Sequence, residues 1–168
     1  PPGGLTYTAH PTVPESWSSY LTEAPMLFLS GNRLVGEKKN MTALSIDRRT
    51  IGAQAAAYLW ETGCRNFIYL CDGPKHLDGE YWAGIQSVAE TNGGSCRLCF
   101  SSRSIEDAAR ELDKVLDPSA PAADCVLTQS NLQAAGVLSA LRARGLAVPE
   151  QVSVMSFENT ELACLTTP

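Results

Sequence analysis

The chain has 168 residues, of which 44% are hydrophobic and 18% are charged, and its net charge is −5. This composition suits one globular domain or two small lobes. It excludes a membrane helix, which needs roughly 18–20 consecutive apolar residues. No signal peptide is visible, and the scattered lysines and arginines disfavour nucleic-acid binding by this segment itself.

Glycines, prolines and capping residues divide the chain into alternating strands and helices. In chain order, the pattern predicts a strand at Leu5–Thr8, a helix at Pro14–Leu21, strands at Met26–Leu29 and Thr42–Ile46, a helix from 48 to 62, a strand at Phe67–Cys71, a helix at Tyr81–Asn92, a strand at Cys96–Phe100, a helix at Ser104–Asp117, a strand at Cys125–Thr128, a helix at Asn131–Arg144 and a strand at Val152–Phe157. This alternation predicts an α/β fold with a largely parallel sheet.

Local signals also mark where the helices begin and end. The helix after Asp47 is expected to bury one apolar stripe, formed by Ile51, Ala55, Tyr58 and Leu59. Glycines at 63, 93 and 145 are expected to end three helices, because glycine tolerates the left-handed conformation there. Ser104 with Asp107 three residues later resembles a capping box.

Six cysteines are present. Cys96 and Cys99 have Cys-x-x-Cys spacing, but no second pair of Cys or His ligands has a matching spacing. Cys71, Cys99 and Cys125 fall within apolar runs, where a thiol behaves as a small hydrophobic group. The sequence therefore favours buried thiols over a metal site or disulfides, and a reducing, cytoplasmic location.

Nearly every predicted strand ends on a small or polar residue. The stretch VPEQVSVMSFENTEL shows this most clearly, because an apolar run typical of a fully buried strand stops at Glu158 and Asn159. Ligands of open parallel sheets bind outside the carboxyl ends of the strands, so this row of polar groups suits a sugar-like ligand. The same residue types are also ordinary helix N-caps, and both interpretations stay open here. The other strand ends are Ser30, Asp47, Asp72, Ser101, Gln129 and Ser130.

No motif of covalent or redox chemistry is present. The chain lacks a G-x-G-x-x-G fingerprint, a phosphate-binding G-K-[ST] loop and a G-x-S-x-G elbow. Asp47, Asp72 and Glu158 are carboxylates at strand ends, but catalysis would need opposed pKa values that a sequence cannot reveal. No catalytic residue, metal ligand or cofactor is predicted, and the chain is not expected to be an enzyme.

Two blocks of sequence resemble the LacI/GalR family of transcriptional regulators. SIDRRTIGAQAAAYLWETGCRNFIYLCDGP is similar to the family's V-D-N segment, Gly/Ala-rich helix and strand ending in G-P. SNLQAAGVLSALRARGLAVPEQVSVMSFENTELACLTTP is similar to its N-D-x-M-A block and V-P-x-D-V-S-V-x-G-F-D-D-T-E strand. Upstream, GGLTYTAHPTVPESWSSYLTEAPMLFLSGNR resembles two strands and the short helix between them, so the likeness covers essentially the whole chain.

The resemblance implies a periplasmic-binding-protein-like effector core, in which two α/β lobes hold a small ligand between them. Residues 1–47 would be part of the N-terminal lobe and residues 48–168 the C-terminal lobe, with Ile46–Arg48 as a crossing segment. The N-terminal lobe would be incomplete, and the family's helix-turn-helix domain would be absent from this chain.

The resemblance also implies which residues would bind the effector. These are Ser30, Asp47, Tyr81, Arg103, Ser130, Asn131 and Glu158. Several depart from the family pattern: Ser30 replaces an aspartate, Tyr81 an arginine and Arg103 an often aromatic residue. Ser130 and Asn131 replace an Asn-Asp pair, and Glu158-Asn159 replaces Asp-Asp. Two interpretations stay open: the site is rebuilt, with Arg103 holding an anionic or hydroxyl-rich ligand and Tyr81 stacking on a sugar ring, or the site has drifted from the family's.

The predicted function is effector sensing for a LacI-type regulator, with a sugar or polyol as the effector. The expected partners are operator DNA, contacted through the missing domain, and a second copy in a homodimer, with no membrane. The alternative is a solute-binding protein of a sugar uptake system, which shares the fold but needs a secretory signal and is poorly suited to six cysteines. A third possibility, an α/β enzyme such as a dehydrogenase, lacks a phosphate-binding loop.

Overall fold

A computed structural model of the chain describes residues 4–8, 26–30, 41–72, 80–116 and 123–165. These residues belong to two compact units, Pro1–Asp47 and Arg48–Pro168. The predicted helix at Pro14–Leu21 lies outside the described residues. Within the described ranges, no helix has the length and hydropathy that a membrane crossing requires.

The first unit contains a parallel sheet of three strands. They are β1 (Gly4–Thr8), β2 (Met26–Ser30) and β3 (Met41–Ser45), in the order β1-β2-β3. Met26 pairs with Gly4 on one side and with Met41 on the other. Ser30 therefore lies level with Ser45 at the carboxyl edge of this sheet. The strands predicted from the sequence agree with these bounds to within one residue.

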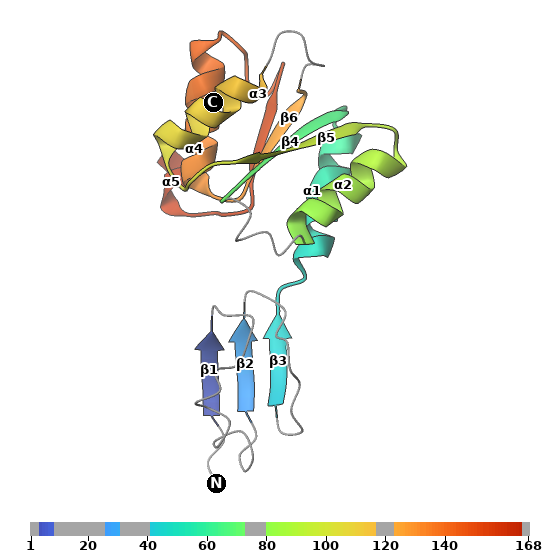
Figure 1. The fold of residues 1–168 in the computed structure, drawn as a ribbon, viewed down its shortest axis with the longest axis vertical. Coiled ribbons are helices and arrows are strands. Elements are labelled where there is room, and N and C mark those ends of the chain that lie inside the picture. Colours follow the sequence, from blue (N-terminus) through green and yellow to red (C-terminus); the bar gives the residue numbers. More distant parts are fainter. Residues whose placement is uncertain (1–3, 9–25, 31–40, 73–79, 117–122, 166–168) are drawn as a thin grey trace. The chain divides into compact units, whose positions relative to one another are not determined.

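The second unit contains a parallel sheet of four strands in the order β5-β4-β6-β7 (Figure 1). The strands are β4 (Asn66–Cys71), β5 (Ser95–Phe100), β6 (Cys125–Thr128) and β7 (Ser153–Ser156). The helices are α1 (Arg48–Glu61), α2 (Glu80–Thr91), α3 (Ile105–Val115), α4 (Asn131–Ala143) and α5 (Glu161–Leu165). The predicted α/β alternation is confirmed, and only α5, which is too short for a periodic signal, was not predicted.

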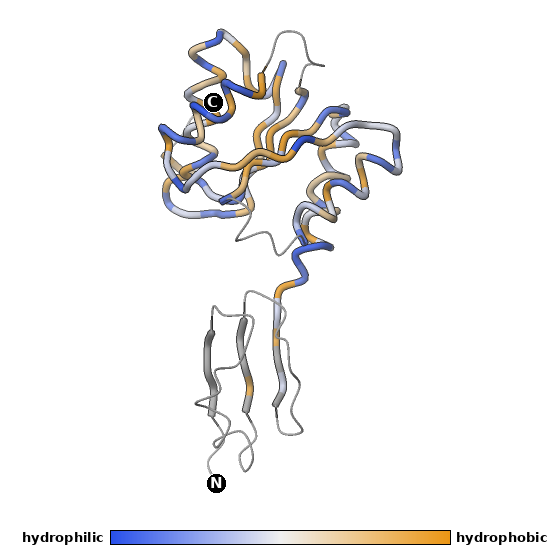
Figure 2. The backbone as a smooth tube through the Cα atoms, in the orientation of Figure 1, coloured by the Kyte–Doolittle hydropathy of each residue, from blue (hydrophilic) through white to orange (hydrophobic). Residues whose placement is uncertain are grey.

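Helices cover both faces of this sheet, with α1 and α2 on one side and α3 and α4 on the other (Figure 1). Successive residues of β4 supply both cores because side chains of a strand alternate between faces. Phe67 and Tyr69 pack in the cluster with α1 and α2, whereas Ile68 and Leu70 pack in the cluster with α3 and α4. Accordingly, the central strands are the most hydrophobic part of the backbone in Figure 2.

Glycines allow the paired helices to approach closely. A Cβ atom at Gly84 of α2 would meet the backbone carbonyl of Arg49 in α1, and one at Gly52 would meet the carbonyl of Tyr81. The buried stripe of α1 is therefore Gly52, Ala56 and Leu59. Of the stripe predicted from apolar side chains, Leu59 is confirmed as buried. The other three positions are wrong, because the contact uses small residues: Tyr58 is 60% exposed, and Ile51 and Ala55 are only half-buried.

The predicted helix ends are confirmed. Gly63, Gly93 and Gly145 have positive φ angles of 106°, 80° and 71°. In each case the backbone amides of the glycine and of the next residue donate to carbonyls of the last helical turn. The Cys64 amide, for example, donates to the Leu59 carbonyl at 3.0 Å. The predicted capping box at Ser104 is half correct: Ser104 accepts from the Asp107 amide, but the Asp107 carboxylate accepts from the amide and hydroxyl of Ser102.

The last strand differs from its prediction in burial. β7 lies at the edge of the sheet and its residues are only half-buried, whereas the apolar run is typical of a fully buried strand. An edge strand has a neighbour on one side only, so apolar composition alone does not ensure its burial. The central strands β4 and β6 are buried almost throughout.

All six cysteines lie within the described residues, and none is disulfide bonded. Cys71, Cys99 and Cys125 are buried, as predicted. The Cys-x-x-Cys pair lies on β5, where an odd spacing places side chains on opposite faces. Cys96 packs with the α1–α2 cluster, whereas Cys99 belongs to the α3–α4 cluster. Burial raises the pKa of Cys96 to about 12 and that of Cys99 to about 11.

Candidate ligand site at the strand ends of the second unit

Three charged side chains meet at the carboxyl edge of the second sheet. Asp72 follows β4, Arg103 follows β5 and Glu158 follows β7. Arg103 Nε donates to Asp72 Oδ2 at 2.5 Å, and Arg103 Nη1 donates to Glu158 Oε1 at 3.0 Å. One guanidinium therefore joins two carboxylates from separate strand ends; Asp72, Arg103 and Glu158 are called the charged triad below.

The charged triad is partly accessible to a ligand. The Arg103 side chain is 50% exposed and that of Glu158 is 33% exposed, while Asp72 is more enclosed. The hydrogen bond to Asp72, ahead of smaller electrostatic effects of Asp72 and Glu158, raises the pKa of Arg103 above its ordinary value. The Arg103 guanidinium therefore stays positively charged at neutral pH, as arginine does in proteins generally.

Gln133 holds Asp72 of the charged triad from the interior of the protein. Its side chain is fully buried, and its Nε2 atom donates to Asp72 Oδ1 at 3.2 Å and to Ser101 Oγ at 3.1 Å. Its Oε1 atom accepts from the Ser130 amide at 3.0 Å. The capping box at the start of α4 is thus formed by Ser130 and Gln133. One buried amide joins the ends of β4, β5 and β6.

The N-terminus of α4 holds Glu158 in place. The Asn131 backbone amide donates to Glu158 Oε2 at 3.2 Å, where the partial positive charge of a helix N-terminus favours a carboxylate. In the orientation that satisfies both ends of its amide, the Asn131 side chain donates to the Glu158 carbonyl and Ser156 Oγ and accepts from Thr160. Asn131 and Ser130 are both buried, and their polar groups form hydrogen bonds with other residues of the protein.

Tyr81 lies at the start of α2, against the residue that precedes Glu158. Its ring stacks on Phe157 with centroids 4.3 Å apart and planes 16° apart. The Phe157 and Tyr69 rings pack edge to face, with centroids 6.0 Å apart, and the Arg48 guanidinium lies 5.5 Å from the Tyr81 centroid. One face of Tyr81 is therefore covered by Phe157, which leaves less of the ring for a sugar than a free tyrosine would offer.

Two of the predicted binding residues lie in the first unit. Ser30 ends β2, and Asp47 follows β3 with an exposed side chain. Within the second unit, Arg103 bonds directly to Glu158. The backbone amide of Asn131 donates to the Glu158 carboxylate, and that of Ser130 donates to the Gln133 side chain. Tyr81 stacks on Phe157. That all seven residues bind an effector remains a prediction.

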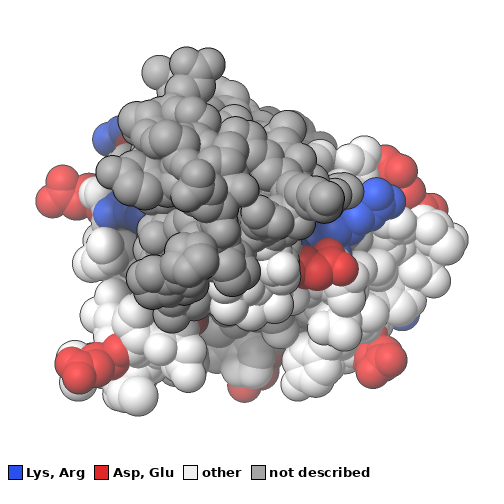
Figure 3. Space-filling view, turned by 90° about the horizontal axis from the view of Figure 1, so that it is seen from below, with Lys and Arg blue, Asp and Glu red and all other residues white. Residues whose placement is uncertain are grey.

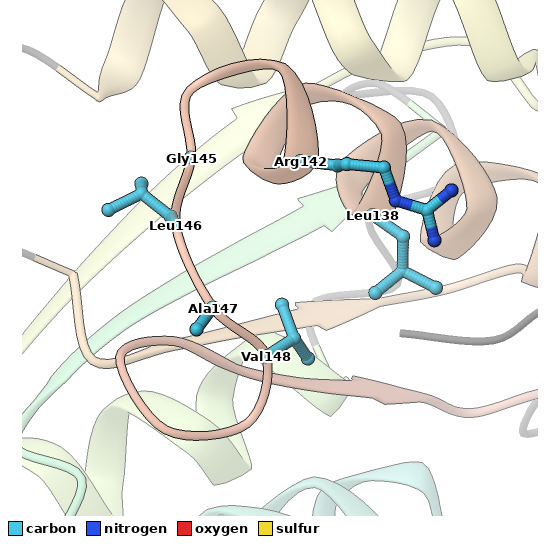
Figure 4. Close-up of a pocket in the computed structure, with 6 residues that line it drawn as sticks. All are labelled: Leu138, Arg142, Gly145, Leu146, Ala147 and Val148. Carbon is cyan, nitrogen blue, oxygen red and sulfur yellow. The ribbon is translucent and has the colours of Figure 1, made fainter.

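A hollow of about 280 Å³ adjoins the charged triad. Its polar part is formed by Asn131, Ser156 and Glu158, and its apolar part by Val148 and residues of α4, β7 and α5. A second hollow of about 370 Å³ lies at the other end of α4 (Figure 4). There Leu138 and Val148 point into the space between α4 and the segment 145–148, and Arg142 is the single charged lining residue. Glu158 is the one member of the charged triad that lines the first hollow, and most of that hollow's lining is apolar.

Sequence reasoning did not place Asp72, Gln133 or Phe157 among the binding residues. Asp72 was visible as a carboxylate at a strand end, and Gln133 as a glutamine where the resembled family has methionine. Phe157 resembles any apolar residue of a strand, so no local signal distinguishes it. The described residues contain no group of three or more His, Cys, Asp or Glu side chains arranged for a metal ion.

Charge is distributed without a continuous basic stripe on the described face drawn in Figure 3. Acidic side chains lie in several separate places there, and basic side chains form small groups beside them.

Comparisons with known proteins agree on the fold. Residues 56–168 match the family described as periplasmic binding protein-like domain. The HTH-type transcriptional regulator DegA of Bacillus subtilis is 30% identical over 132 residues, which cover 76% of this chain and 39% of that protein. The chain thus spans less than half of this relative's length.

Solved structures give the same result at lower identity. A sugar-binding LacI family transcriptional regulator from Escherichia coli, complexed with phosphate, matches with a TM-score of 0.76 and 21% identity over 98% of this chain and 59% of that one. A LacI family transcriptional regulator from Enterococcus faecium, with bound ribose, matches with a TM-score of 0.71 and 17% identity over 92% of this chain and 57% of that one. The predicted periplasmic-binding-protein-like α/β fold is confirmed.

Proposed function

The chain belongs to the family of periplasmic binding protein-like domains, and we propose that it is part of the effector-binding core of a LacI-type transcriptional regulator. The effector is a small, sugar-like molecule, and the chain is not an enzyme. The relatives named above are transcriptional regulators, one of them sugar-binding and one with bound ribose. Residues 1–47 would contribute to the N-terminal lobe and residues 48–168 would form the C-terminal lobe.

The observation that carries this proposal is the charged triad at the carboxyl ends of β4, β5 and β7. Open parallel sheets bind their ligands at this edge. Asp72 and Glu158 offer acceptor oxygens, and Arg103 offers donors, which is the combination that sugar hydroxyls need. Tyr81, Ser130 and Asn131 would shape the site around these groups, and Ser30 and Asp47 are the proposed ligand-binding residues of the first unit.

Regulation follows from differential binding. A ligand shifts only an equilibrium between states for which it has different affinities. We propose that effector binding favours one arrangement of the lobes in a cytoplasmic homodimer. In the full-length protein, this change would alter the spacing of DNA-binding domains on the operator.

The proposal is tested by a thermal-shift screen of neutral monosaccharides and disaccharides against the full-length natural protein. We expect at least one sugar to raise Tm in a concentration-dependent manner, because a ligand that binds only the folded state stabilises it. Asp72→Asn and Glu158→Gln should weaken this response. Glu150→Gln is the matched control, since Glu150 is exposed and precedes β7, at the opposite edge of the sheet from Glu158. A screen in which no sugar shifts Tm contradicts the proposal.

The alternative function is that of a solute-binding protein for sugar uptake. It is not favoured, because the relatives named above are transcriptional regulators. N-terminal sequencing and intact mass of the natural product separate the two. A leading helix-turn-helix segment of net positive charge supports the regulator, and a cleaved secretory signal supports the transport protein.

A further inference from the structure

We infer that the charged triad selects a neutral polyhydroxyl ligand over its anionic analogues, and that Arg103 and Glu158 determine this selection. The inference rests on the proposed function, since it concerns the ligand class of the same site. The sequence alone leaves open whether Arg103 would hold an anionic or a hydroxyl-rich ligand. The contacts of Arg103 distinguish these two classes.

The cation of the site is already paired. Arg103 donates to Asp72 at 2.5 Å and to Glu158 at 3.0 Å, so two built-in carboxylates occupy the positions that an anionic ligand would use. An incoming phosphate or carboxylate must approach a guanidinium whose charge is balanced and must also meet two negative groups. Like charges brought together at a binding surface oppose association.

The two carboxylates are held in place and cannot easily turn away from an anion. The second oxygen of Asp72 accepts from Gln133 Nε2 at 3.2 Å. The second oxygen of Glu158 accepts from the Asn131 amide at 3.2 Å. Because Gln133 is buried and Asn131 begins α4, both donors belong to the rigid framework. The negative charge of the charged triad is therefore a fixed feature of the site.

A hydroxyl group suits the remaining hydrogen-bonding capacity. Among the described residues, Arg103 donates hydrogen bonds through Nε and Nη1 and none through Nη2, and its side chain is half exposed. A hydroxyl can accept from Nη2 and donate to the remaining lone pairs of Asp72 or Glu158, whereas a deprotonated anionic group can only accept. A neutral sugar or polyol satisfies both types of group at once.

The test compares matched neutral and anionic ligands on the full-length protein by isothermal titration calorimetry. The probes are glucose with glucose 6-phosphate and gluconate, galactose with galactose 6-phosphate and galactonate, and ribose with ribose 5-phosphate and ribonate. The wild-type protein should bind the neutral member of a pair about tenfold more tightly or better. Raising the salt concentration should narrow this preference, because partly exposed charges are screened.

Two variants should move the preference in opposite directions. Glu158→Gln removes one negative charge and should narrow the preference for the neutral member, whereas Arg103→Gln leaves two carboxylates without their cation and should widen it. Glu150→Gln and Arg144→Gln are the matched controls, because both residues are exposed and lie at the opposite edge of the sheet, Arg144 in its own ion pair with Asp113. Circular dichroism checks that each variant is folded, and the salt dependence of the wild type tests the inference without any variant.

The outcomes separate the inference from the proposed function. Tighter wild-type binding of an anionic member overturns the inference while the sensing function stands. A preference that both variants shift in the same direction, or that salt leaves unchanged, overturns it as well. Failure of every probe to bind a folded protein counts against the proposed function itself.

Discussion

The side-chain amide of Gln133 donates to Asp72 Oδ1 across 3.2 Å, although 61 positions separate the two residues in the chain. The same side chain bonds to Ser101 and to the Ser130 amide and is fully buried. Asp72 is consequently fixed in the orientation in which it accepts from Arg103. A residue that contacts no solvent thus positions a group that does.

Replacing Gln133 with leucine should lower the free energy of unfolding by about 2–4 kcal/mol, because buried polar partners left without a hydrogen bond cost about 1–3 kcal/mol each. Urea denaturation measures the change. Gln54→Leu, at an exposed position of α1, is the matched control and should stay within about 0.5 kcal/mol of wild type. A loss below about 1 kcal/mol for Gln133→Leu would contradict the role assigned to this side chain.

Two glycine substitutions should differ because their causes differ. At Gly84 an added Cβ meets the backbone of α1, which cannot move without separating the helices. Gly84→Ala should therefore cost about 3 kcal/mol. At Gly145 no atom lies within 4 Å of an added Cβ, but φ is +71°, so Gly145→Ala should cost only about 1–2 kcal/mol of backbone strain. Urea denaturation of both variants checks the order, and the reverse order would refute the close approach of α1 and α2.

Thiol reactivity should distinguish one cysteine from the other five. Cys164 is exposed, Cys96 is half-buried and the remaining four are buried. With Ellman's reagent under native conditions, we expect one rapidly reacting thiol, and six after denaturation in urea. Cys164→Ser should remove the rapid phase, while Cys96→Ser should leave it unchanged. Two or more rapid equivalents in the native protein would contradict this prediction, because at least one thiol besides that of Cys164 would then be accessible.

Alkaline pH should destabilise the protein through its buried thiols. Burial raises the pKa of Cys99 to about 11 and that of Cys96 to about 12, against 9.0 for an unperturbed thiol. Above pH 9 the unfolded chain loses thiol protons that the folded chain keeps, so the unfolded state binds fewer protons and stability falls as pH rises. The loss is at most about 1.4 kcal/mol per thiol per pH unit, up to the folded pKa.

Urea denaturation at pH 8, 9 and 10 under reducing conditions measures this slope. Cys99→Ala should make the slope shallower by removing one buried thiol. Cys164→Ala, which changes an exposed cysteine, is the matched control and should keep the wild-type slope. Equal slopes in the two variants would mean that other groups cause the alkaline loss.

Features that depend on neighbouring residues were predictable from the sequence. The left-handed glycines at 63, 93 and 145 end their helices because no other residue adopts that backbone so easily. The central strands were located within one or two residues because their apolar runs are bounded by polar turns. The polar strand ends, including Glu158 and Asp72, were located in the same way, since parallel strands all expose their carboxyl ends at one edge.

Contacts between distant segments required the tertiary structure. Tyr58 is exposed because α1 meets α2 through Gly52 and Gly84, and apolar periodicity does not report contacts made by glycine. β7 is only half-buried because the strand order places it at an edge. By itself, the sequence determined the alternating elements and the polar residues at their ends, since these follow from local backbone preferences and burial. Only the tertiary structure decided that Arg103 lies between Asp72 and Glu158, because the order of strands in a sheet depends on packing across the whole unit.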